Sequence, residues 1–214
     1  SSAASDVYKR QRKRYKDMSK LIYLDNAATT QVYPEVLQEM LPYFSEVYSN
    51  PSAIYSFASE SKKAVDKART SVAELINAKT DEIYFTGGGS ESDNWALKAA
   101  AEAFKSKGNH IITTKIEHHA ILHTCEWLEK HGYEVTYLDV DEYGKVDPKE
   151  FEAAIKDTTI LASIMFANNE IGTVEPIKEL GAIAHSKGVI FHTDAVQAFA
   201  HIPILSLIHI SEPT

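Results

Sequence analysis

From residue 80 onward, short runs of β-branched and aromatic residues alternate with longer segments whose apolar residues recur at helical spacing. Short apolar runs bounded by turn residues are typical of buried strands, and apolar positions three and four apart are typical of helices. The predicted strands are EIYF (82–85), HIITT (110–114), EVTYLDV (134–140), TILASIMF (159–166) and VIFHTDA (189–195). The predicted helices cover residues 90–107, 119–132, 149–157 and 177–188.

Strands that alternate with helices along a chain indicate consecutive βαβ units. The pattern therefore predicts an α/β fold in three layers, a doubly wound and mostly parallel sheet with helices on both faces. Such sheets bind ligands at the carboxyl ends of their strands. Ahead of the alternation we expect an extended arm, LIYLDNAATT (21–30), and helices near residues 34–48 and 56–77.

Composition excludes several function classes. The chain has 214 residues and a net charge of -8, which disfavours a nucleic-acid surface because such surfaces are basic. No apolar run approaches the ~20 residues of a membrane helix, and no stretch has the pattern of a signal peptide. The single cysteine, Cys125, excludes an internal disulfide and fits a reducing cytoplasm. It shares an apolar helical face with Ile121, Leu122 and Leu128, which indicates a packed core thiol rather than a nucleophile.

The two ends of the chain do not follow the periodic pattern between them. SSAASDVYKRQ (1–11) and LSLIHISEPT (205–214) resemble translated sequencing-adaptor sequence, and Met18 is the expected true start. We therefore expect residues 1–17 and 205–214 to be tails that are foreign to the fold or disordered, and residues 18–204 to form the domain with its N-terminal arm.

Three consecutive glycines, Gly87 to Gly89, stand between the predicted strand 82–85 and a helix that begins near Ser90. Free backbone N–H groups at a helix N-terminus bind anions, most often a phosphate, and the helix dipole adds to the attraction. The spacing matches neither the dinucleotide fingerprint nor the P-loop. A tight turn without a ligand is the alternative that the local pattern leaves open.

Two histidines, His118 and His119, stand at the next strand-to-helix corner, where ligands lie in such sheets. One interpretation is an imidazole face stacked on a planar ring. A second is a zinc site that uses His119 and His123, although the HExxH glutamate and a third ligand are missing. A third is that the histidines are surface residues of a helix, which fits His123 and His131.

Polar side chains also follow the next two strands. Asn168 and Asn169 offer amide donors to a ligand oxygen, although turn chemistry alone explains asparagines at such a place. Asp194 ends an apolar strand, and a buried carboxylate without a partner is costly, so a cationic or N–H partner in a ligand is favoured. The alternative for Asp194 is an N-cap of the following turn. Gln197 would lie on the same side if that turn is helical.

A phosphate cradle, a stacking imidazole, an amide and a strand-end carboxylate together describe the surroundings of pyridoxal 5'-phosphate (PLP). The segments YLDNAATT, NPSAIYSFA, FTGGGSESDN, KIEHHAILHTCEWLE, ANNEIGTVEPI and HTDAVQAFAHIPI resemble the cysteine desulfurase family of fold-type I PLP enzymes, which is class V aminotransferase-like. The resemblance runs from about Leu21 to Ile204, with several motifs in the family's order. It implies that residues 18–204 are part of a PLP-binding large domain.

The resemblance implies roles for six residues at matching positions. Gly89 and Ser90 would hold the phosphate, where the family commonly has Ala-Thr or Gly-Thr. His118 would stack on the pyridine ring and move protons as a catalytic residue.

The other three would contact the polar atoms of the ring. Asn169 would approach the ring hydroxyl and the carboxylate of the substrate. Asp194 would bind the pyridine nitrogen, and Gln197 the ring hydroxyl. No metal is implied.

The resemblance further implies a reaction and its partners. L-cysteine would be converted to L-alanine, and its sulfur would become an enzyme-bound persulfide for iron–sulfur cluster assembly on a scaffold or another acceptor. The enzyme would be a cytoplasmic homodimer that binds neither nucleic acid nor membrane. A selenocysteine lyase, or another enzyme of the class V aminotransferase type, is the alternative within this fold.

The sequence departs from the family pattern after residue 204. The family places its Schiff-base lysine shortly beyond this point, in a Ser-x-His-Lys segment, followed by a catalytic cysteine loop and a small C-terminal domain. These segments are absent from the 214 residues, and nothing in the family supports Lys115 as a replacement. We therefore expect this chain by itself to be an inactive, truncated piece of a desulfurase, or a non-catalytic fragment.

Overall fold

The computed structural model describes residues 22–204. The expected tails, 1–17 and 205–214, and the expected start at Met18 lie outside these residues. The chain divides into two units, Ser1–Leu37 and Gln38–Thr214, and each is described by itself. In the first unit, residues 22–33 form neither helix nor strand apart from a turn at 26–28, as expected of an arm.

The two helices predicted in the N-terminal part of the chain are both shorter in the structure, and one of them is divided. The helix expected near 34–48 is two helices, α2 (Pro34–Met40) and α3 (Pro42–Ser45). Pro42 stands at the first position of α3, where its missing N–H group costs nothing but where it prevents α2 from continuing. The helix expected at 56–77 is α4 (Ala58–Leu75), and a 3₁₀ turn, η2 (Thr80–Glu82), follows it.

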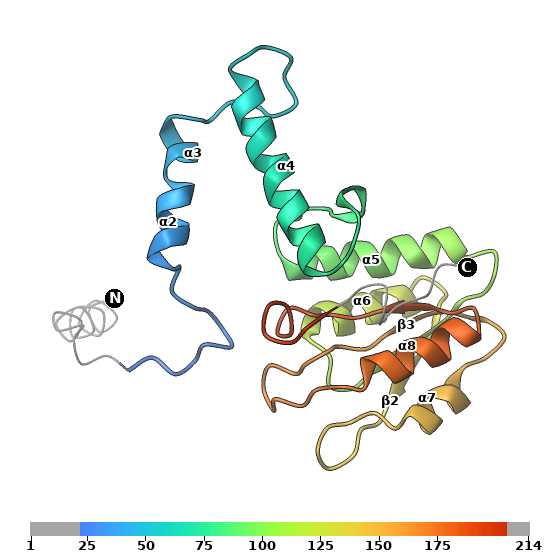
Figure 1. Ribbon diagram of the computed structural model, residues 1–214. Coiled ribbons are helices and arrows are strands. Elements are labelled where there is room, and N and C mark those ends of the chain that lie inside the picture. The colour runs from blue at the N-terminus through green and yellow to red at the C-terminus, as the bar shows by residue number, and fades with distance from the viewer. Residues whose placement is uncertain (1–21, 205–214) are drawn as a thin grey trace, which may run out of the picture. The chain divides into compact units, whose positions relative to one another are not determined.

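A parallel four-stranded sheet forms the centre of the second unit (Figure 1). Its strands are β1 (His110–Thr114), β2 (Glu134–Leu138), β3 (Thr159–Ser163) and β4 (Ile190–His192). Their order is β2-β1-β3-β4, and every neighbouring pair is parallel. The helices around the sheet are α5 (Gly89–Phe104), α6 (His119–Glu129), α7 (Pro148–Ala154) and α8 (Ile177–Ser186).

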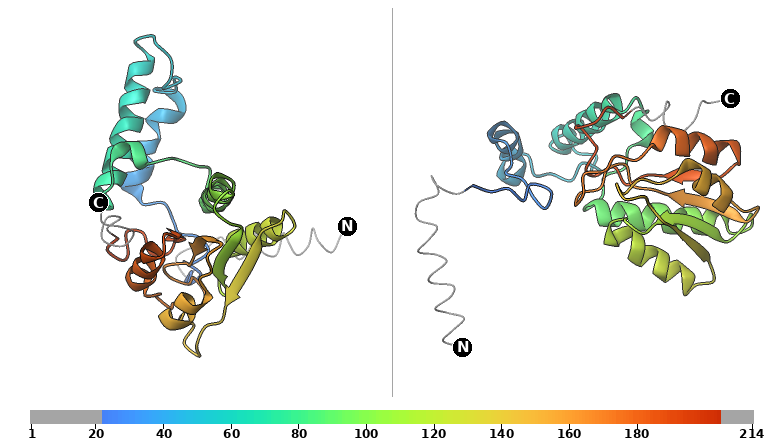
Figure 2. Two further views of the ribbon diagram at one scale, coloured as in Figure 1. Left: turned by 90° about the vertical axis from the view of Figure 1, so that its right-hand side faces the viewer. Right: turned by 90° about the horizontal axis from the view of Figure 1, so that it is seen from below.

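The sheet is covered on both faces, which confirms the predicted three layers. Ile111 of β1 packs with Leu97 of α5 and Cys125 of α6, while its neighbour Ile112 packs with Leu180 of α8 on the opposite face. Successive side chains of a strand point to opposite faces, so each strand contributes to both cores. Figure 2 shows the green α5 and yellow-green α6 on one side of the sheet and the orange α8 on the other.

The strand order creates one topological switch point. The chain runs from β1 outward to β2, returns across β1 to β3, and continues to β4 on the other side. Neighbouring connections therefore leave the carboxyl ends of β1 and β3 in opposite directions, and a crevice opens between them in sheets of this kind. The loops after β1, β3 and β4 all reach this edge.

The predicted strand EIYF (82–85) is wrong. It forms no strand, and Tyr84 and Phe85 are 67% and 53% exposed. Its aromatic rings contact helices instead: Tyr84 lies edge-on to Trp95 of α5 at 5.5 Å, and the guanidinium of Arg69 lies 5.2 Å from the Phe85 ring. A strand needs a neighbour to pair with, and no strand within residues 22–204 pairs with this run.

The other predicted elements exist, but several end earlier than predicted. β3 ends at Ser163 rather than 166, and β4 covers only 190–192 of the predicted 189–195. The backbone beyond them still pairs, because Ile164 N–H bonds to the His192 carbonyl and Phe166 N–H to the Asp194 carbonyl. The helices α5 and α6 end at Phe104 and Glu129, each three residues earlier than predicted. Such differences are common because sequence determines the type of an element better than its boundaries.

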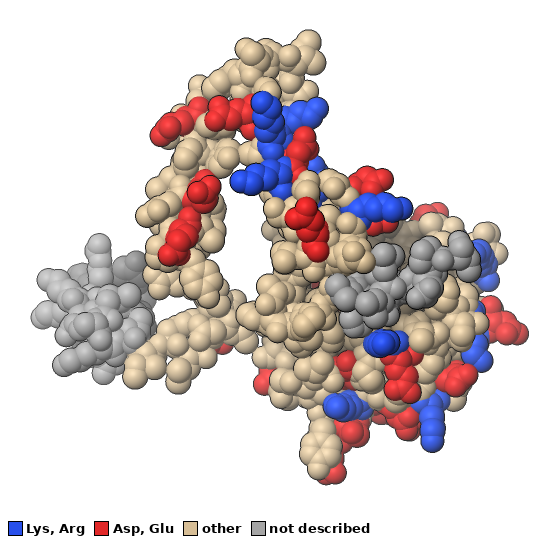
Figure 3. Space-filling model, in the orientation of Figure 1, with Lys and Arg blue, Asp and Glu red and all other residues tan. Residues whose placement is uncertain are grey.

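The surface of the protein carries charged side chains of both signs. On the face shown in Figure 3, Lys and Arg side chains are interspersed with Asp and Glu. No helix within residues 22–204 is long and apolar enough to cross a membrane.

The interpretation of Cys125 as a core thiol is confirmed. Its side chain is fully buried in the cluster formed by α5, α6 and the sheet. Burial raises the pKa of the thiol to about 12, so the reactive thiolate is scarce at neutral pH.

Replacing Cys125 should therefore affect packing and nothing else. We expect Cys125→Ala to lower the free energy of unfolding by about 1 kcal/mol, measured by urea denaturation, because one buried sulfur is lost. Cys125→Ser should cost more, since it buries a hydroxyl in an apolar cluster. Rapid reaction of the folded chain with an aromatic disulfide reagent at pH 8 would contradict this assignment.

Candidate functional site at the carboxyl edge of the sheet

Hydrogen bonds join the three loops at the carboxyl edge of the sheet. The Met165 N–H, after β3, donates to Glu117 Oε1, after β1, at 3.0 Å. The Phe166 N–H donates to the carbonyl oxygen of Asp194, after β4, at 2.9 Å. The predicted site residues on these loops therefore belong to one connected edge, as the parallel topology requires.

The N-terminus of α5 is open, as the glycine run predicts. Gly88 is the N-cap residue, and no side chain caps the helix. The Gly87 N–H donates to the carboxylate of Glu91, while the N–H groups of Gly89 and Ser90 have no partner within residues 22–204. These two groups are free for an anion, and a 16-residue helix contributes its dipole.

Gly89 also allows close packing at this end of the helix. A Cβ atom at this position would lie 3.0 Å from Cγ2 of Val196, which is tighter than ordinary contact. The absence of a side chain therefore lets the turn after β4 approach the open N–H groups of α5. The turn that follows Asp194 and the N-terminus of α5 therefore lie next to one another.

Asp194 is buried, with 8% of its surface exposed. Its Oδ1 accepts a hydrogen bond from the Val196 N–H at 2.9 Å, so it caps the following turn, which was the alternative interpretation. Its Oδ2 makes no hydrogen bond to any described residue, and remains available to a ligand. Gln197 follows within that turn and is half-buried.

His118 is exposed and is the N-cap residue of α6. Its Nδ1 accepts a hydrogen bond from the Ala120 N–H at 3.1 Å. An accepting Nδ1 places the imidazole proton on Nε2, because a neutral ring carries one proton. The Nδ1 hydrogen bond thus fixes the orientation of the His118 ring.

The other histidines of this segment stack on one another or on an aromatic ring of α6. The rings of His119 and His123 stack on one another at 5.4 Å, and the ring of His131 stacks on Trp127 at 3.6 Å. Across residues 22–204, no three His, Cys, Asp or Glu side chains come together in a way that would hold a metal ion. The zinc interpretation of His119 and His123 gains no support.

The two adjacent asparagines differ in their environment. Asn168 is buried; its side chain donates to the Ile116 carbonyl at 2.9 Å and accepts from the backbone of Glu170 and Ile171. For this residue the turn-chemistry alternative is correct. Asn169 is half-buried, and its side chain makes no hydrogen bond to any residue that the structure describes.

Three titratable residues at this edge were missed by the sequence reasoning, namely Asp93, Glu117 and His192. Glu117 is 5% exposed; its Oε1 accepts from the Thr114 hydroxyl and the Met165 N–H, and its Oε2 has no partner in the described part of the chain. Burial raises the pKa of Glu117 to about 8, against the opposing effect of these two hydrogen bonds. At neutral pH it is therefore largely protonated.

Asp93 and His192 lie on facing elements, α5 and β4. Burial, and then the charge of Asp194, raise the pKa of Asp93 to about 7. Burial lowers the pKa of His192 to about 4. Sequence signals for these residues existed: Asp93 shares the helical stripe of Leu97 and Ala101, where an acid is out of place, and Glu117 directly precedes His118.

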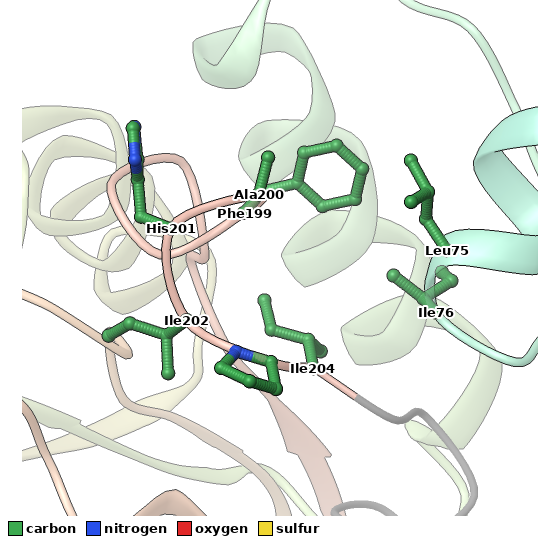
Figure 4. A pocket seen from close by; sticks show the side chains of 8 residues that line it. Leu75, Ile76, Phe199, Ala200, His201, Ile202 and Ile204 are labelled. Carbon is green, nitrogen blue, oxygen red and sulfur yellow. The ribbon is translucent and has the colours of Figure 1, made fainter.

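A different hollow lies away from this edge. It has a volume of about 240 Å³ and is lined by Leu75 and Ile76, at the end of α4, and by residues 199–204 (Figure 4). Its lining is mostly apolar, with His201 as the one titratable side chain among the lining residues, and it includes none of the six predicted site residues. The candidate site is therefore the carboxyl edge, where the predicted residues lie.

The raised pKa of Glu117 predicts how stability depends on pH. The folded-state pKa lies above the ordinary 4.5, so the stability that this group contributes is complete below about pH 4.5 and is lost as the pH rises through about 8. Between pH 7 and 9 this loss is on the order of 1 kcal/mol, because the group is half protonated on average over the two pH units. His192 titrates below this range in both states.

We expect the Glu117→Gln variant to lose less stability than the wild type between pH 7 and 9, measured by urea denaturation at each pH. Its neutral amide keeps an acceptor for Thr114 and Met165. The exposed Glu102→Gln is the matched control and should behave as the wild type. Equal pH slopes in the wild type and Glu117→Gln would show that Glu117 is ionised throughout.

Most of the chain matches known proteins. Residues 22–206 match the model of the family described as aminotransferase class-V. The cysteine desulfurase IscS of Clostridium botulinum strain Kyoto is 60% identical over 187 residues, covering 87% of this chain and 47% of that protein. The cysteine desulfurase IscS of Methanosarcina thermophila is 59% identical, with 87% and 46% covered. The chain thus spans about half the length of the curated relatives it matches.

Solved structures give the same result. A NifS-like protein matches with a TM-score of 0.85 and 39% identity, over 88% of this chain and 53% of the other. SspA, in complex with cysteine, matches with a TM-score of 0.84 and 40% identity, over 87% and 54%. Because the family model matches most of its 214 residues, the chain belongs to the aminotransferase class-V family.

Proposed function

We propose that the protein carrying these residues is a PLP-dependent cysteine desulfurase. The observation that carries the proposal is the close approach of Val196, in the turn that follows Asp194, to Gly89 at the open N-terminus of α5. Asp194 itself is buried. A ligand with a phosphate for the N–H groups of α5 and a cationic ring nitrogen for Asp194 would satisfy both. The names of the relatives, at 60% and 59% identity, support the choice of reaction.

The residues at the edge fit PLP. Gly89 and Ser90 present N–H groups without partners, and the Ser90 hydroxyl adds a further donor to a phosphate. The unbonded Oδ2 of Asp194 supplies the acceptor that a protonated pyridine nitrogen requires. Gln197 holds the ring hydroxyl, and the exposed ring of His118 covers the face of the pyridine. When bound, PLP supplies the electron sink for bond cleavage at the α- and β-carbons of an amino acid.

The protein's own groups bind, orient and move protons. The hydrogen bond from Ala120 N–H keeps His118 Nδ1 unprotonated and leaves the proton on Nε2, from where it can be passed to the substrate. Asn169, with its free amide, orients the carboxylate of the substrate. A charge-assisted hydrogen bond that Asp194 accepts from the ring N–H would contribute about 1.5–3 kcal/mol and keep the ring nitrogen protonated.

We further propose the partners of this reaction. L-cysteine is the substrate, which the cysteine-bound structure of SspA supports at 40% identity. The products are L-alanine and an enzyme-bound persulfide, and an iron–sulfur scaffold or a comparable acceptor takes the sulfur. The protein acts as a cytoplasmic homodimer.

A chimera tests this proposal, because the chain spans about half of its relatives. Residues 22–204 would replace the matching segment of the Clostridium botulinum desulfurase, with which the chain is 60% identical. We expect the purified chimera to release sulfide and L-alanine from L-cysteine in the presence of PLP. Asp194→Asn in the chimera should lower kcat/KM roughly 10- to 100-fold, the equivalent of one charge-assisted hydrogen bond.

The exposed Asp66→Asn is the matched control and should keep the activity of the chimera. Circular dichroism and thermal unfolding should be the same for both variants, so that a loss of turnover is not a loss of fold. A folded chimera without sulfide release, or an Asp194→Asn variant with full turnover, would contradict the proposed function.

A further inference from the structure

Three polar side chains stand behind Asp194, on the face of the sheet that α5 covers. They are Asp93 of α5, Ser163 of β3 and His192 of β4. Along β4 the side chains alternate, so His192 points to the face that α5 covers and Phe191 to the other, where it packs against the α7 and α8 core.

The imidazole of His192 lies between the other two. Its Nδ1 is 2.9 Å from the Ser163 hydroxyl, a hydrogen bond that fixes the ring. Its Nε2 is 3.9 Å from Asp93 Oδ1, which is longer than a hydrogen bond but within the range of an ion pair. Asp93 is 4% exposed. The three groups therefore form a connected, largely buried cluster, and the charge of Asp194 acts on two of them, Asp93 and His192.

Asp93 and Asp194 have no basic side chain, among the described residues, that would balance a negative charge on both. Within residues 22–204, no Lys or Arg forms an ion pair with Asp93 or Asp194, and the nearest basic residue on α5, Lys98, bonds to Asn94 and lies over the Trp127 ring. Two neighbouring buried carboxylates do not both ionise without a cation. Either Asp93 keeps a proton, or His192 takes one and pairs with it.

The environment of each group decides between these two states. Burial and the charge of Asp194 raise the pKa of Asp93, and burial lowers that of His192 to about 4. Glu117, after β1, also interacts with Asp194, and burial raises its pKa to about 8, so it is largely uncharged at neutral pH. Below about pH 7 the proton therefore resides on Asp93 rather than on His192, and the contact between them is not an ion pair.

We propose that Asp93 and His192 are positioning residues for Asp194: a protonated Asp93 and a neutral imidazole form an uncharged support behind it, so that the negative charge of this region stays on Asp194. There it faces the cationic ring nitrogen of a pyridine-type ligand. The identity of the ligand rests on the proposed function, whereas the coupling between Asp93 and Asp194 does not.

Carboxyl ¹³C NMR of the 214-residue chain, labelled in aspartate, measures this coupling without a cofactor. Asp93→Asn identifies the signal by its loss. We expect the Asp93 signal to titrate with a midpoint near 7, and Asp194→Asn to lower this midpoint by roughly one pH unit, since a neighbouring charge shifts a carboxyl group by about 1–3 units. The exposed Asp66→Asn should leave it in place.

Adding 4'-deoxypyridoxine 5'-phosphate, which lacks the aldehyde and needs no lysine to bind, tests the ligand. Its ring nitrogen should neutralise Asp194 and so lower the Asp93 midpoint in the wild type. The shift should be absent in Asp194→Asn. Throughout the titration the imidazole of His192 should keep the chemical shifts of its neutral form.

Three results would overturn the proposal: an Asp93 midpoint near that of an exposed aspartate, a midpoint that does not respond to Asp194→Asn, or an imidazolium at His192 at pH 6. If the probe fails to bind while Asp194→Asn still lowers the midpoint, the coupling between the two acids holds. That result would overturn the PLP site and, with it, the ligand that Asp194 is proposed to face.

Discussion

The carboxyl edge of the sheet depends on one constraint, which is that buried carboxyl groups lie there without basic partners among the described residues. Asp93, Glu117 and Asp194 are each less than a tenth exposed, and within residues 22–204 none of them forms an ion pair with Lys or Arg. Burying a carboxylate costs several kcal/mol unless it is paired or protonated. Asp93 and Glu117 meet this constraint by keeping a proton, as their raised pKa values show. The Oδ2 atom of Asp194 accepts no hydrogen bond from a described residue. A cationic group of a ligand would be a suitable partner for it.

The fold brings these groups together because all four strands are parallel. Their carboxyl ends reach one edge, and the reversal between β1 and β3 opens that edge to a ligand. The two apolar cores hold the edge from below: α5 and α6 cover one face, α7 and α8 the other. The absent side chain of Gly89 then lets the Asp194 turn reach the N-terminus of α5. The candidate site and the fold thus depend on the same packing.

The sequence pattern predicted correctly those elements that depend mainly on neighbouring residues in the chain. β1 has the predicted bounds, and the three-layer architecture follows from the alternation of strands and helices. EIYF (82–85) failed because a strand depends on a partner, which no local pattern supplies. Sequence also could not separate Asn168 from Asn169, since only the fold shows which amide bonds to the backbone. Asp93 was missed because its significance lies in its distance to His192 and Asp194, residues about a hundred positions away in the chain.

The protonation state of the ring nitrogen tests the central claim most directly. ¹⁵N NMR of 4'-deoxypyridoxine 5'-phosphate, labelled at the ring nitrogen and bound to the 214-residue chain, reports it without any turnover. If the charge of Asp194 is held for a cationic ring, the bound nitrogen should remain protonated at a pH at which the free probe has lost its proton. A bound probe whose nitrogen titrates as it does in free solution would contradict the account, because Asp194 would then not face it.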